Sequence, residues 1–93
     1  FIYLLHEEQI FDIPAFKKYY NSLQKIGFAR GNADILLDCL KLNSFVLQCI
    51  IYHFLPHDLF VIKNLPEKID DCIAMLDTAN DHLTSLLKVE LNV

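Results

Sequence analysis

Glycine and proline are scarce in this sequence, with two and three copies respectively among 93 residues. A chain with so few of them is neither collagen-like nor of low complexity. The two glycines, Gly27 and Gly31, have a spacing that matches neither GxGxxG nor GxxxxGK(S/T). The sequence therefore excludes the glycine-rich loops that bind dinucleotides and nucleoside triphosphates.

Cysteine is also sparse, and Cys39, Cys49 and Cys72 form an odd, widely spaced set among apolar neighbours. No CxxC pair that would indicate a zinc site is present. The pattern is typical of reduced thiols that pack as small hydrophobic side chains. We therefore expect an intracellular protein, either cytoplasmic or nuclear.

Positive charge is in deficit, because eight Lys and Arg face twelve Asp and Glu, for a net charge of −4. Residues 1–46 are balanced, so the whole excess lies in residues 47–93. Affinity for nucleic acid and for anionic lipid depends mainly on Lys and Arg. Direct binding to nucleic acid is therefore not expected. The one basic patch suits an acidic protein partner better, and its members are Lys17, Lys18, Lys25 and Arg30.

A long hydrophobic run is missing as well. The most apolar segment, Phe45–Leu55, has 11 residues, whereas a membrane span needs about 20. Extending it crosses Pro56–Asp58, and no basic segment precedes the apolar Phe1–Leu5. We expect neither a membrane partner nor a secretory signal, and we expect residues 1–93 to be a single domain cut from a longer protein.

Apolar side chains are in excess, at 54% of the residues, compared with a usual share of about 45–50%. A domain of this size buries only about two-thirds of the surface that its unfolded chain exposes. The surplus predicts that part of the apolar surface faces a partner.

Helix signals are clearest in residues 12–27. Asp12 can cap the free amides, Pro14 suits a first turn and Gly27 suits a left-handed stop. Two further helices are predicted, a short one over Ala33–Leu42 and a buried one over Phe45–Leu55 that begins at a Ser44 cap. The rival interpretation of the last segment is a strand, since β-branched and aromatic residues are frequent in it. Residues 1–11 fit a short helix or a strand.

The segment from Pro66 to Leu91 has an apolar arc about 160° wide at 100° per residue. It predicts a long amphipathic helix, continuous or broken at Asn80–Asp81, where either residue could cap a new helix. If unbroken, Asn80 would mark a helix–helix interface within the apolar arc. The predicted fold is all-α, a compact bundle of four to six helices with a long C-terminal amphipathic helix. The alternative is α+β with a small hairpin from residues 45–62.

Zinc-ligand residue types recur every four residues at Cys49, His53 and His57. Pro56 ends a helix before His57, however, and one helix rarely supplies three tetrahedral ligands. The run from His6 to Ile10 begins like HExxH but has isoleucine where the second histidine must stand. We expect no metal site here.

Paired carboxylates such as Asp70 with Asp71, or Asp77 with Asp81, fall on the polar arc of the last helix. Water solvates them there, so nothing raises a pKa toward neutrality for acid–base chemistry. No nucleophile motif surrounds a serine or cysteine. We therefore expect no enzyme, no catalytic residue and no cofactor.

The sequence favours a protein–protein interaction or self-association module, an adaptor or scaffold domain that forms a homodimer or a hetero-complex. The apolar stripe of the C-terminal helix is the expected contact surface. The alternative is an apolar-ligand or enzyme-associated regulatory domain with a pocket near residues 45–57, where His53 or His57 is the polar contact. The predicted interface residues are Leu76, Asn80, Leu83, Leu87, Leu91, Tyr19 and Tyr20.

Overall fold

Four α-helices contain most of the residues that the structure, a computed structural model, describes, which are 1–27, 31–55 and 60–91. The helices are α1 (Ile2–Glu7), α2 (Ile13–Gln24), α3 (Ala33–Phe54) and α4 (Ile69–Leu91). No strand occurs in these ranges, where the β-type pairing is an isolated parallel bridge between Ile10 and Lys63. The all-α prediction is confirmed, and the hairpin alternative is wrong for the part of residues 45–62 that is described.

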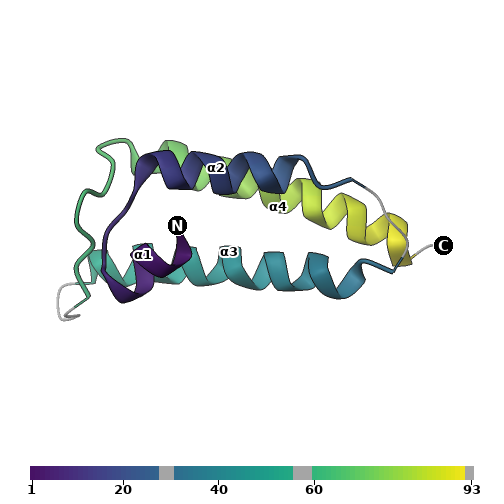
Figure 1. The fold of residues 1–93 in the computed structure, drawn as a ribbon, viewed down its shortest axis with the longest axis horizontal. Helices are drawn as coiled ribbons and strands as arrows, with labels where there is room; N and C mark the ends of the chain where they lie inside the picture. Colours follow the sequence, from purple (N-terminus) through teal and green to yellow (C-terminus); the bar gives the residue numbers. More distant parts are fainter. Residues whose placement is uncertain (28–30, 56–59, 92–93) are drawn as a thin grey trace.

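The helices form an elongated molecule of 46 × 25 × 21 Å. Figure 1 shows α2 and α4 running in the same direction, with α3 antiparallel to both and α1 against the C-terminal half of α3. The most extensive helix–helix contact joins α3 to α4. At about 35 Å for 23 residues, α4 lies along the long axis of the molecule.

The start of α2 matches the sequence signals. The Asp12 carboxylate accepts a hydrogen bond from the Ala15 backbone N–H at 3.0 Å, and Pro14 occupies the first turn. The predicted stop is wrong, because α2 ends at Gln24 with Lys25 as its C-cap in a right-handed conformation. Because the cap residue is right-handed, the end of α2 needs no glycine, and Gly27 lies beyond it. Likewise α4 begins at Ile69, after Pro66.

The separation of residues 33–55 into two helices is also wrong, because α3 is continuous from Ala33 to Phe54. Ser44 is exposed within it and caps nothing. The neighbouring Asn43 is fully buried, and its side chain bonds to two other helices rather than to the local backbone. Polar side chains can break a helix by competing for its backbone hydrogen-bonding groups. The Asn43 side chain bonds to Tyr19 and Asn80 instead, so α3 remains intact. The predicted end at Pro56 lies outside the described residues.

Buried apolar side chains form two clusters along the long axis. The first lies around α1 and the adjoining parts of α2, α3 and α4, and it consists of Leu5, Phe11, Phe16, Val46, Cys49, Ile50, Ile62, Cys72 and Leu76. The second lies toward the other end and consists of Leu23, Leu36, Ala79 and Leu83. The Phe1 ring makes edge contacts with Phe11 and Phe16 at centroid distances of 5.3 and 5.2 Å. The first cluster therefore fixes the N-terminus against α2.

The connection before α4 is tied to the rest of the chain by backbone hydrogen bonds. Phe11 N–H donates to the Lys63 carbonyl at 2.8 Å, and Lys63 N–H donates to the Gln9 carbonyl at 2.6 Å. Ile62 N–H donates to His53 Nδ1 at 2.9 Å. Because Nδ1 accepts this bond, His53 is a structural acceptor at the end of α3, in the tautomer protonated on Nε2.

Candidate interaction surface

The apolar stripe of α4 packs mainly inside this chain. Leu76 and Leu83 are 0% exposed and belong to the first and second clusters respectively. Leu87 is half-buried against the second cluster, while Leu91 is 73% exposed at the end of the helix. A partner could reach Leu76 or Leu83 only if α4 were displaced. Of the predicted leucines, Leu91 is the one that offers a large exposed area.

Two of the predicted interface residues, Tyr19 and Asn80, meet the buried Asn43 in a part-buried network that joins three helices. The Tyr19 hydroxyl donates to Asn43 Oδ1, and Asn43 Nδ2 donates to Asn80 Oδ1 at 2.7 Å. Asn80 therefore marks a helix–helix contact within the chain, and α4 continues through it without a break. Tyr20 is half-buried against the second cluster. A buried amide of this kind fixes the register of the helices it joins.

The Tyr19 phenol should titrate abnormally. Burial, and after it the negative charge of an ionised Cys39, raises the pKa of Tyr19 from 10.0 to about 12. The fold favours the neutral phenol, so this contribution to stability is complete below pH 10 and is lost as the pH rises to about 12. After discounting for solvent screening, we expect a loss of about 1–2 kcal/mol.

Ultraviolet absorbance of the phenolate, measured against a Tyr19→Phe variant, checks this expectation. One tyrosine should ionise near pH 12 in the wild-type chain, and that step should be missing in the variant. A wild-type titration in which every tyrosine ionises near pH 10 would contradict the buried network.

The three cysteines are free thiols, with Cys49 and Cys72 buried and Cys39 half-buried. Burial raises the pKa of each thiol, and the Asp38 carboxylate adds to the effect at Cys39. A thiol with a raised pKa carries less of the nucleophilic thiolate at neutral pH. Their chemistry is that of small core side chains.

The described residues give no support to the metal site or to the ligand pocket considered from the sequence. The described residues contain no group of three His, Cys, Asp or Glu side chains that could hold a metal ion, and His57 lies outside them. A shallow cavity of about 630 Å³ lies between residues 10–14 and 64–67, away from residues 45–57. Its Asp12 carboxylate already caps α2.

Large exposed hydrophobic side chains gather on α3 instead. They include Ile51 at 56% and Phe54 at 61% exposure, and the others on this helix and its cap are Ile35, Leu37, Leu42, Tyr52 and Leu55. The prediction that Phe45–Leu55 is buried all round is therefore wrong. The molecule is too thin for that, because α4 and α1 cover α3 on some of its sides only.

Six exposed positions at alternating intervals of four and three residues run along the outward side of α3. We call them the outer stripe, which consists of Leu37, Lys41, Ser44, Gln48, Ile51 and Leu55. Positions so spaced lie on one face of a helix. The outer stripe is therefore apolar at both ends and polar in its middle.

Among the described residues, α3 is long and apolar enough to cross a membrane, by length and composition alone. Its most apolar 18-residue window has a mean hydropathy of 1.6, and 28% of that window is buried. The expectation of no membrane-spanning segment rested on the 11-residue apolar run Phe45–Leu55. Because α3 is continuous from Ala33 to Phe54, the helix is longer than that run. A helix that packs on one small core and stays largely uncovered would have the same mean hydropathy and buried fraction.

Comparisons of the chain with known protein families, curated proteins and solved structures found no match. The geometry of the described residues is therefore the basis for a functional proposal.

Proposed function

We propose that this chain is a protein–protein interaction module whose contact surface is the outward side of α3. The observation that carries the proposal is the group of exposed large hydrophobic side chains at the C-terminal end of that helix, Ile51, Phe54 and Leu55. Contiguous exposed apolar surface on a small domain marks a binding site more often than scattered single residues do. The surplus of apolar residues thus supports a partner, on a different helix from the one predicted.

Covering this surface would be favourable. Burying a large aliphatic or aromatic side chain contributes about 1.5–3 kcal/mol relative to full exposure. Ile51, Phe54 and Leu55 are each roughly half exposed, so about half of that value remains available at each of them. Three such side chains next to one another can anchor an interface, because a few residues usually dominate its energy.

The remaining parts of the proposal follow from the sequence and the side-chain chemistry. We propose a bundle that acts without catalysis, cofactor or nucleic acid, in a reducing intracellular compartment. The free, largely buried thiols support the compartment. The partner is either another protein or a second copy of the chain.

A lipid bilayer is the second candidate for covering α3, on the strength of its length and hydropathy. We favour a protein because one side of α3 is already committed to polar contacts within the chain. Asn43 bonds to α2 and α4, and Asp34, Asp38 and Lys41 lie along the same helix. Charged side chains at such positions are costly inside a bilayer.

Affinity purification of the tagged chain tests the proposal. The variant Ile51→Glu with Leu55→Glu places two charges on the outer stripe. The matched control, Thr78→Glu with Ser85→Glu, places the same charges at exposed positions on α4. We expect the stripe variant to lose at least about tenfold in recovery of specific partners, while the control retains them and both keep the wild-type helical signal. Equal recovery by all three chains would contradict the proposal.

A further inference from the structure

We propose that the face formed by the outer stripe of α3 and the adjacent acidic row of α4 binds a basic amphipathic helix of another protein. This inference rests on the proposed function, and it names the chemistry of the partner. Two features of the described residues carry it. They are the position of unpaired carboxylates beside the exposed apolar positions, and the mismatch of the same face with a second copy.

The acidic row consists of Asp70, Asp77 and Asp81, all exposed on α4. Intervals of seven and four residues place them on one line of the helix. Thr84 and Lys88 continue the line in the last turns, so the negative charge is confined to the first half of α4. Within the described residues, the contact between a basic and an acidic side chain joins His6 to Glu7, so these three carboxylates are unpaired.

The position of the acidic row relative to α3 follows from the Asn43–Asn80 hydrogen bond. On α4, Asn80 has Leu76 and Leu83 beside it on the core side, both fully buried. Its neighbours on the other side, three residues before and four after, are the exposed Asp77 and Thr84. The acidic row therefore borders α3 on the solvent side of the α3–α4 contact.

The outer stripe borders the same contact from α3. Leu40 packs against the second cluster, which includes Leu83 of α4. Leu37 and Ser44 lie three residues before and four after Leu40, so they are its neighbours toward solvent. The other side of α3 faces α1, where the rings of His6 and Phe45 are 5.1 Å apart. The outer stripe and the acidic row thus share one face.

A basic amphipathic helix matches this face in chemistry. Its apolar side would cover Leu37, Ile51 and Leu55, and Lys or Arg on its flank would face Asp77 and Asp81. The acidic row carries three negative charges, against Lys41 on the outer stripe and Lys88 in the last turn of α4. The face is therefore net negative and attracts a partner of positive charge.

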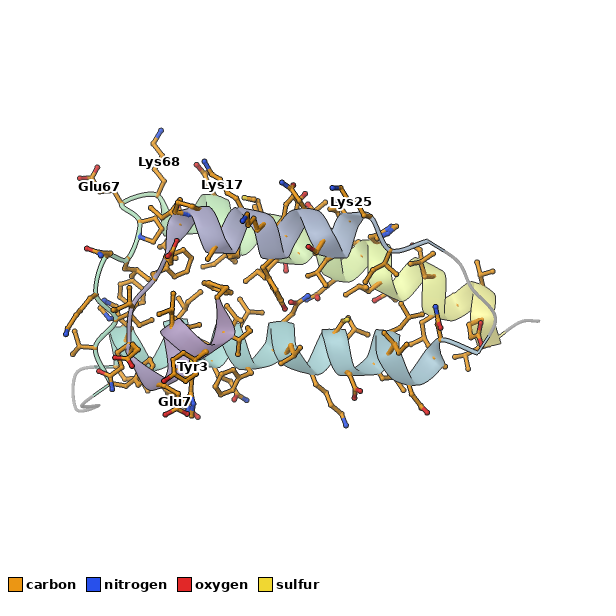
Figure 2. All side chains as sticks on the ribbon, viewed as in Figure 1. Tyr3, Glu7, Lys17, Lys25, Glu67 and Lys68 are labelled. Carbon is orange, nitrogen blue, oxygen red and sulfur yellow. The ribbon has the colours of Figure 1, made fainter. Side chains whose placement is uncertain are left out.

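A second copy matches less well. An antiparallel pair of α3 helices about a twofold axis would bring the two acidic rows together, which costs binding energy. The lysines of α2 do not substitute for a basic partner helix. Lys17 and Lys18 are exposed, as Figure 2 shows for Lys17, but the apolar side of α2 is buried through Phe16 and Leu23.

Fluorescence anisotropy with two synthetic helical peptides tests the inference on the full 93-residue chain. Both peptides carry leucine on one face, and they differ in having lysine or glutamate along the flanks. We expect the lysine peptide to bind at least about tenfold more tightly, with an affinity that falls as salt is added. Asp77→Lys with Asp81→Lys should remove that preference.

The matched control is Glu8→Lys with Asp71→Lys, which makes the same change in net charge at exposed positions off this face. It should retain the preference for the lysine peptide. Equal binding of the two peptides, or an equal effect of the two charge variants, would overturn the inference. So would a dimer, seen by sedimentation, that the lysine peptide dissociates. None of these outcomes would change the result for the proposed function, which is tested by the loss of partners in Ile51→Glu with Leu55→Glu. The two proposals can therefore fail independently.

Discussion

Asn43→Leu is expected to destabilise the chain by about 2–4 kcal/mol, although leucine is the more hydrophobic residue and close in size. Asn43 is fully buried, accepts from the Tyr19 hydroxyl and donates to Asn80. Leucine removes the bonding partner of both Tyr19 and Asn80, which are half-buried between the helices, and their desolvation is then no longer compensated. Urea denaturation followed by circular dichroism measures the difference. Asn21→Leu, at an exposed position on α2, is the control and should change the free energy of unfolding by less than about 0.5 kcal/mol.

A triple variant separates the cost of unpaired groups from the value of the network itself. Tyr19→Phe, Asn43→Leu and Asn80→Leu together remove every polar member. Because replacing all the partners of a buried polar network can be nearly neutral, the triple variant should recover most of the stability that Asn43→Leu loses. If the triple variant were as unstable as the sum of its parts, the three residues would not be coupled.

Leu76→Ala is expected to cost about 3–5 kcal/mol, because the side chain is fully buried and the cavity it leaves is enclosed by α2, α3 and α4. Leu83→Ala should behave similarly in the second cluster. Leu91→Ala, at the exposed end of the same apolar stripe, should cost less than about 0.5 kcal/mol. The measurement is again urea denaturation. Equal effects at Leu76 and Leu91 would mean that α4 is not packed in this way.

The burial of Leu76 and Leu83 limits which variants of the α4 stripe can report on partner binding. A charged substitution at Leu83 would be expected to unfold the chain, since it buries an unpaired charge. Loss of a partner in such a variant would report lost folding and not a lost contact. Variants at the exposed Ile51 and Leu55 avoid that ambiguity.

Local signals in the sequence were sufficient for the helices with clear brackets. Asp12 and Pro14 located the start of α2, and the amphipathic period located most of α4, because capping and periodicity depend on residues close together in the chain. The continuity of α3 was missed, because the two residues that bond Asn43 lie 24 and 37 positions away. Long-range partners of a polar residue leave no local pattern.

The location of the exposed apolar surface could not be predicted for a similar reason. Composition indicates that apolar residues are in excess, but it does not say which helix receives enough neighbours to be covered. The wide apolar stripe of α4 was predicted to be the contact surface, whereas packing buries most of it and leaves the outward side of α3 exposed. The signal for the outer stripe was the spacing of Leu37, Ile51 and Leu55, and it was hidden by Lys41, Ser44 and Gln48 at the intervening positions.

Site-specific photo-crosslinking at position 51 tests most directly whether the outward side of α3 contacts another protein. A photoreactive phenylalanine replaces Ile51 in one sample of the full chain in cells, and Thr78 in the control. Both positions are exposed, on α3 and α4 respectively. We expect a discrete protein adduct from position 51 and a much weaker one from position 78. Adducts of equal yield at both positions, or an adduct at position 51 to lipid alone, would contradict it.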